Sequence, residues 1–79
     1  MTNKQKLESA LSQLQSSPYQ GDIASNSTIK FHKSLSIDGE KIGNVWAIWS
    51  GGLQPEFWGN FDEVLSRIEQ EVELEKEGL

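Results

Sequence analysis

The sequence predicts one small α+β domain over residues 1–79, in the order helix, strand, strand, a third strand or crossing segment, and helix. Apolar residues recur every three or four positions near both ends of the chain, which is typical of amphipathic helices. Between these ends apolar and polar residues alternate, which is typical of strands, and an Asp-Gly pair at 38–39 indicates a hairpin turn. We therefore expect an antiparallel hairpin or three-stranded sheet with both helices packed on one face.

The first helix is predicted over about 3–16. Thr2 and Gln5 have the spacing of a capping box. One helical face then carries four apolar residues: Leu7, Ala10, Leu11 and Leu14. The pattern stops before Pro18, because proline disfavours helical geometry in the residue that precedes it. Residues 18–27 are rich in Gly, Asp, Asn and Ser, so we expect a loop there.

A hairpin is predicted from 28 to 50 around the Asp38-Gly39 turn, because a type I′ turn needs positive φ at both central positions. The second strand should span about 40–50. A two-residue loop fixes the cross-strand pairs as Ile37 with Glu40, Leu35 with Ile42, Lys33 with Asn44, Phe31 with Trp46, and Ile29 with Ile48. In this register the two polar residues that break the apolar pattern, Lys33 and Asn44, face each other.

The C-terminal part is predicted to hold a short edge strand or crossing segment over 53–58, since Pro55 lacks the N–H that a central strand needs. Asn60 is expected to cap a second helix that ends near Gly78. The buried face of this helix should consist of Phe61, Val64, Leu65, Ile68 and Val72.

The composition narrows the class of protein. The chain has no cysteine and one histidine, so we expect no disulfide, no structural zinc and no other bound metal or cofactor. No apolar run reaches the about 20 residues that span a bilayer, and the polar N-terminus does not resemble a signal peptide. We therefore expect a complete cytoplasmic protein that does not contact membranes.

The net charge of −5 is unevenly distributed. Residues 1–55 hold five lysines and four acidic residues, whereas residues 56–79 hold eight acidic and two basic residues. A phosphate backbone would be repelled by this acidic third, so we expect no direct nucleic-acid binding. Double-stranded-RNA-binding domains share the element order, but their second helix opens with lysines where this chain has Phe61-Asp62-Glu63.

No catalytic residues are predicted. His32 has no nucleophile or carboxylate partner in the predicted register and is interpreted as a surface histidine. Ser50-Gly51-Gly52 lacks the spacing of a nucleophile elbow or a phosphate loop and is interpreted as a turn. A straight helix cannot wrap its carboxylates around calcium as a loop does. The chain is therefore expected not to be an enzyme.

Two groups of residues are candidates for partner binding. The first, which we name the acidic arc, lies on one side of the second helix: Asp62, Glu63, Glu69, Glu73 and Glu77. It could contact a cationic partner or serve only as a solvated face. The second group is Trp49 and Trp58. These tryptophans either form an interaction hot spot or lie in a small second core covered by residues 53–60.

These features predict a protein-binding module that occupies a basic surface of a partner protein. In its most specific form the chain is an inhibitor that imitates nucleic-acid charge, as small acidic phage proteins do against CRISPR nucleases and restriction enzymes. That likeness is one of size, acidity and simple α+β build, and no motif is shared. The alternative is a structural, assembly or accessory subunit that forms a homodimer through the aromatic face of its sheet.

Overall fold

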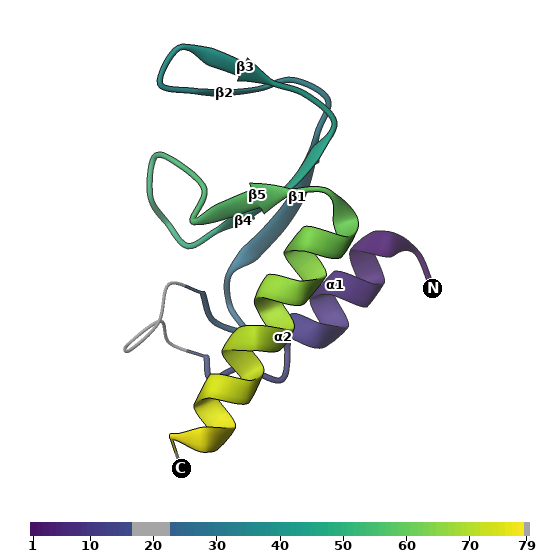
Figure 1. Ribbon diagram of the computed structural model, residues 1–79, viewed down its shortest axis with the longest axis vertical. Helices are drawn as coiled ribbons and strands as arrows, with labels where there is room; N and C mark the ends of the chain where they lie inside the picture. The colour runs from purple at the N-terminus through teal and green to yellow at the C-terminus, as the bar shows by residue number, and fades with distance from the viewer. Residues whose placement is uncertain (17–22, 79) are drawn as a thin grey trace.

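The computed structural model describes residues 1–16 and 23–78 and confirms a small α+β domain of two helices with small antiparallel sheets (Figure 1). In chain order the elements are α1 (Asn3–Leu11), β1 (Thr28–His32), β2 (Leu35–Ile37), β3 (Glu40–Ile42), β4 (Val45–Trp49), β5 (Phe57–Gly59) and α2 (Phe61–Glu77). Strands β1, β4 and β5 form one antiparallel sheet with β4 in the middle, and β2 pairs with β3. A third strand therefore exists, the edge strand β5 after Pro55, but it spans Phe57–Gly59 and not the predicted 53–58.

The predicted hairpin register is confirmed. Both central turn residues have positive φ, 51° at Asp38 and 81° at Gly39, as a type I′ turn requires. The observed pairs are Ile37 with Glu40, Leu35 with Ile42, Phe31 with Trp46, and Ile29 with Ile48. The Asn44 N–H donates to the Lys33 carbonyl over 3.3 Å, so these two polar residues do lie opposite each other.

The hairpin is bent at this polar pair, which the sequence did not predict. The single strand expected over 40–50 is interrupted at Gly43-Asn44, where Asn44 has a φ of 56°. A Cβ atom on Gly43 would lie only 2.8 Å from the Lys33 carbonyl oxygen, so the two chains approach more closely than a side chain would allow. Figure 1 shows β2 and β3 turned away from the direction of β1 and β4.

The bend divides the buried apolar residues into two cores. The main core joins both helices to one face of the three-stranded sheet, through Leu7, Ala10, Leu11, Leu14, Ile23, Ile29, Ile48, Val64, Ile68 and Val72. Trp46 packs against this core, so both helices lie on one face of the sheet, as predicted. The second core lies on the other face and contains Leu35, Ile37, Val45 and Ala47, with Ile42, Trp49 and Trp58 packed against it.

Helix α1 begins as predicted but is shorter. Thr2 and Gln5 form the capping box, with the Gln5 N–H 3.2 Å from the Thr2 hydroxyl oxygen. The helix ends at Leu11 and not near residue 16, although Leu14 is still buried in the main core. The predicted loop at 18–27 lies outside the described residues as far as 22. Its remainder, 23–27, forms no helix or strand but buries Ile23.

Helix α2 is the longest element and crosses the sheet beside α1 (Figure 1). Its start is fixed by a capping box in which the Glu63 N–H donates to the Asn60 side chain over 2.8 Å. The helix ends at Gly78 as predicted, although this glycine has a helical φ of −77° and not the positive value of a C′ glycine. Within residues 1–16 and 23–78, neither helix has the length and apolar character needed to cross a membrane.

Candidate functional site

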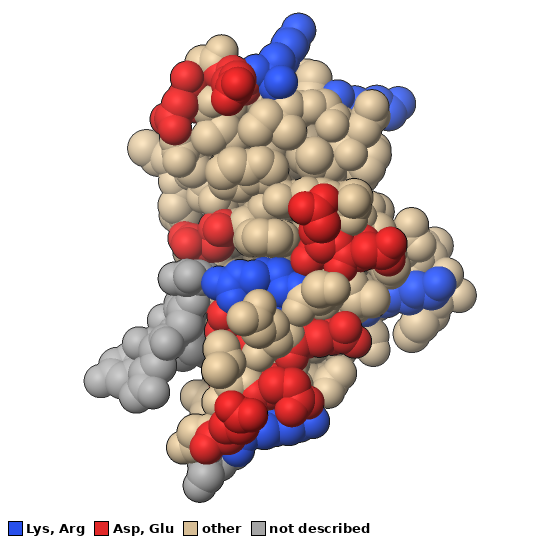
Figure 2. Space-filling model, in the orientation of Figure 1, with Lys and Arg blue, Asp and Glu red and all other residues tan. Residues whose placement is uncertain are grey.

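The two sides of α2 differ sharply in chemistry. Val64, Ile68 and Val72 are buried against the sheet and α1. The helix as a whole carries seven acidic and two basic residues, a net charge of −5. Figure 2 shows acidic side chains along the length of α2 on the face that points to the viewer. The helical periodicity has therefore produced the predicted arrangement, with an apolar face turned inward and carboxylates turned to solvent.

The members of the acidic arc do not all have the same environment. Glu63 takes part in the capping box, since its carboxylate accepts from the Asn60 N–H over 3.2 Å. Glu73 lies 3.8 Å from the Lys76 ammonium, and both side chains are about two-thirds exposed, at 68% and 63%. Asp62, Glu69 and Glu77 are exposed and have no ion pair or hydrogen bond with any other described side chain. These three are the most available carboxylates of the arc.

The remaining acidic residues of α2 are already used within the domain. Glu71 forms an ion pair with Arg67, and the Arg67 guanidinium lies 5.9 Å from the centre of the Phe57 ring. The Glu75 carboxylate accepts from the Gln15 N–H over 3.2 Å, which ties the end of α2 to the segment after α1. Because Arg67 is engaged with Glu71 and Phe57, Lys76 is the basic residue of α2 that lies beside the arc.

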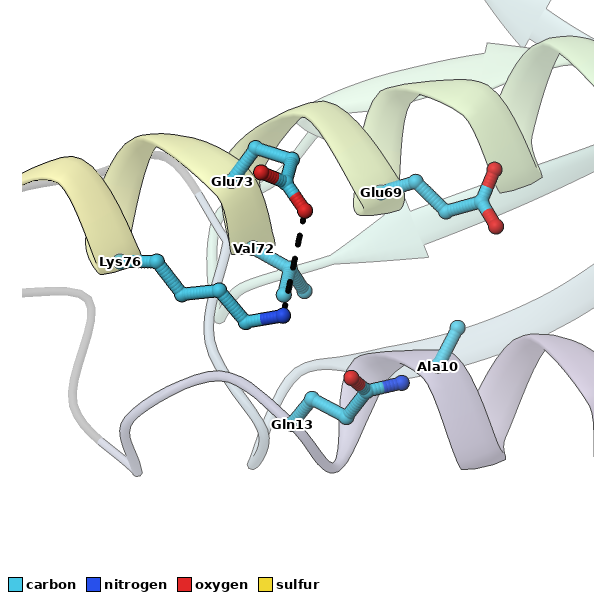
Figure 3. Close-up of a pocket in the computed structure, with 6 residues that line it drawn as sticks. All are labelled: Ala10, Gln13, Glu69, Val72, Glu73 and Lys76. Atoms are coloured by element: carbon cyan, nitrogen blue, oxygen red, sulfur yellow. Dashed lines mark ion pairs between the residues drawn. The ribbon is translucent and has the colours of Figure 1, made fainter.

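A shallow open groove separates α2 from α1 beside the acidic arc. It encloses about 230 Å³ and is lined by Ala10, Gln13, Glu69, Val72, Glu73 and Lys76. We name it the α1–α2 groove. Figure 3 shows Glu69, Glu73 and Lys76 on the α2 side, facing Ala10 of α1 and Gln13 of the turn that follows α1. Ala10 and Gln13 were not candidates from the sequence, because their position depends on how two helices about 60 residues apart pack together.

The tryptophan pair lies away from the acidic arc, on the other face of the sheet. Both Trp49 and Trp58 are half-buried and pack against the second core. The Trp49 indole N–H donates to His32 Nε2 over 3.2 Å, and the two rings are 5.7 Å apart. His32 is therefore half-buried and hydrogen-bonded, in contrast to the surface histidine that the sequence predicted. The tryptophans therefore pack against a second core, which is one of the two alternatives stated above. Residues of β2 and β3 also contribute to this core.

The arc and the tryptophans therefore form separate surfaces, and neither has a recognisable catalytic arrangement. Among residues 1–16 and 23–78, no group of three or more His, Asp or Glu side chains is placed to hold a metal ion. Comparison of the chain with family models, curated proteins and solved structures finds no match.

Proposed function

We propose that this chain is a non-enzymatic protein-binding module whose acidic arc contacts a basic surface of a partner protein. The observation that supports the proposal is the poorly compensated charge of α2. Glu69, Glu73 and Glu77 follow one another at i, i+4 spacing, where like charges destabilise a helix by about 0.2–0.5 kcal/mol per pair. Glu77 also opposes the helix dipole at the C-terminal end. A cationic partner would turn this unfavourable arrangement into favourable association.

A more specific form of the proposal concerns the identity of the basic surface. Successive carboxylates four residues apart are separated by about 6 Å along a straight helix axis, so the arc presents a stiff row of negative charge. Such a row suits a surface that otherwise binds the phosphates of a nucleic acid. The chain would then inhibit its partner by occupying that surface, as small acidic phage inhibitors do. We propose a cytoplasmic location for this role.

The second candidate is a homodimeric structural or accessory subunit that associates through the aromatic sheet face. The partial exposure of Trp49 and Trp58 favours it, because tryptophans are enriched at binding hot spots. However, β2 and β3 contribute to a core on the same face, which reduces the area left for a second copy. Sedimentation of the wild type and of Trp58→Ala distinguishes the candidates, because only the dimer model predicts a concentration-dependent dimer that the substitution weakens.

The test of the main proposal uses two variants with equal charge. In one, three arc residues are replaced (Glu69→Gln, Glu73→Gln and Glu77→Gln). In the other, three exposed glutamates elsewhere are replaced (Glu8→Gln, Glu40→Gln and Glu56→Gln). Each immobilised protein is exposed to lysate of its source cells, and retained proteins are identified by mass spectrometry.

The proposal predicts a basic protein that the wild type and the second variant retain and the arc variant does not. Nucleic acid should then compete with the wild type for that partner. The proposal is wrong if the arc variant retains the same proteins as the wild type, and the inhibitor form is wrong if nucleic acid and the chain bind the partner together.

A further inference from the structure

The α1–α2 groove differs from the rest of the acidic arc because two apolar residues, Ala10 and Val72, line it together with polar side chains. Ala10 and Val72, which belong to the groove lining, are only 8% and 7% exposed. Its volume of about 230 Å³ lies below the range of about 300–1,000 Å³ that is usual for small-molecule sites. The groove is thus too small and open for a cofactor but suits a single extended side chain.

The chain itself already places a cation in this groove. Figure 3 shows the Lys76 side chain extended along the groove, with its nitrogen directed toward Glu73 beside Val72. The groove therefore accommodates an aliphatic chain that ends in a positive charge. The separation of 3.8 Å and the high exposure of both groups make this ion pair weak, since exposed pairs contribute about 0–1 kcal/mol. An incoming cation can displace the Lys76 ammonium at little cost.

Glu69 supplies the second half of the site. Its carboxylate has no ion pair with the described part of the chain, whereas the Glu73 carboxylate has only the weak pair with Lys76. The two glutamates lie one helical turn apart on the same wall, opposite the amide of Gln13, which follows α1. The groove therefore offers an incoming cation two carboxylates on its α2 wall and the Gln13 amide oxygen on the opposite wall.

We infer that the α1–α2 groove receives an arginine side chain of the basic partner, an inference that rests on the proposed function. The aliphatic part of the arginine would lie on Ala10 and Val72, and its guanidinium would bond to Glu69 and Glu73. Long basic side chains commonly bury their stems in this way. Arginine fits better than lysine because its planar group offers five donors and is more weakly hydrated than an ammonium. Asp62 and Glu77 lie on the arc but do not line the groove.

The first experiment compares two double variants that remove equal charge from the arc. Glu69→Gln with Glu73→Gln changes the groove, whereas Asp62→Asn with Glu77→Gln changes the arc outside it. Binding of a nona-arginine peptide is measured by calorimetry after thermal melts have shown that both variants fold. We expect the groove variant to bind about tenfold more weakly, because two charge-assisted hydrogen bonds are lost. The affinity of the variant with Asp62→Asn and Glu77→Gln should fall only about twofold, because it loses only screened long-range attraction.

The second experiment removes the cation that the chain supplies. Lys76→Gln should strengthen binding of the same peptide more than Lys41→Gln does, although each substitution changes the net charge equally and Lys41 lies in β3. In amide and methyl NMR spectra, the peptide should shift Ala10 and Gln13 of the α1 side as well as α2. A nona-lysine peptide should bind more weakly than nona-arginine.

The outcomes separate this inference from the proposed function. The inference about the groove is wrong if both double variants lose the same affinity for the peptide, or if the Ala10 and Gln13 signals do not shift. The acidic arc would then remain a general contact for a basic surface. Equal affinity for the arginine and lysine peptides would overturn the choice of arginine. If neither double variant weakens binding, the groove and the proposed function are both wrong.

Discussion

Replacing Gly43 with alanine should destabilise the domain by about 1–2 kcal/mol, because the hairpin bends where Gly43 passes the Lys33 carbonyl. The added methyl would lie 2.8 Å from that backbone oxygen, which cannot rotate away as a side chain could. Forcing an extra carbon into a packed site typically costs about 1–3 kcal/mol. The lower entropy of the unfolded alanine chain offsets about 0.4–1 kcal/mol of this penalty. The expected fall in melting temperature is about 4–16 °C for a domain of this size.

Gly52→Ala provides the matched control. A Cβ atom on Gly52 would meet its nearest neighbour at 3.6 Å, an ordinary contact, and Gly52 does not have a positive φ. This variant should therefore melt within about 0.5 kcal/mol of the wild type. Both variants are followed by thermal circular dichroism and by tryptophan fluorescence, which reports on Trp49 and Trp58 in the second core. Equal melting temperatures for the two variants would refute the close approach at the bend.

Three further substitutions test the rest of the fold by chemical denaturation. Ile48→Ala should destabilise the domain by about 2–5 kcal/mol, because Ile48 is fully buried in the main core; a loss below 1 kcal/mol would place it outside that core. Trp49→Phe should lower the free energy of unfolding by about 1 kcal/mol, because the hydrogen bond to His32 is lost. In a His32→Phe background the same change should cost less, and equal costs in the two backgrounds would show that the bond contributes nothing to stability. Asn60→Ala should cost about 1 kcal/mol by removing the cap of α2, and an unchanged midpoint would mean that Glu63 alone holds the first turn.

Local signals in the sequence predicted the ends and pairing of several elements correctly. The Thr2 and Asn60 caps depend on side chains a few residues away, and the Asp38-Gly39 turn needs only its own backbone geometry. Once the turn was placed, the two-residue loop fixed every pair of the hairpin. The acidic arc was predictable for the same reason, since helical periodicity alone places Glu69 and Glu73 on one side.

Features that depend on distant contacts were not predictable. The alternation of apolar and polar residues indicates that Leu35 and Ile29 lie on the same side of the strand. It does not indicate the bend at 33–34 and 43–44, which places Leu35 in a different core from Ile29. Leu14 continues the helical apolar pattern yet lies beyond the end of α1, where burial and not helix formation holds it. The α1–α2 groove exists only because Gln13 and Ala10 pack beside α2, a contact that no local pattern encodes.

The claim that the acidic arc binds a basic partner is tested most directly by measuring how fast the protein associates with the basic partner from the capture experiment. The measurement is repeated at several salt concentrations. The wild type is compared with the two triple glutamine variants, in which Glu69, Glu73 and Glu77 or Glu8, Glu40 and Glu56 are replaced. The account predicts an association rate that falls steeply with salt for the wild type and for the second variant. The arc variant should associate more slowly and lose most of this dependence, and its free form should be slightly more stable than the wild type. Identical rates and salt dependence for the two triple variants would contradict the account and leave the arc as a solvated face.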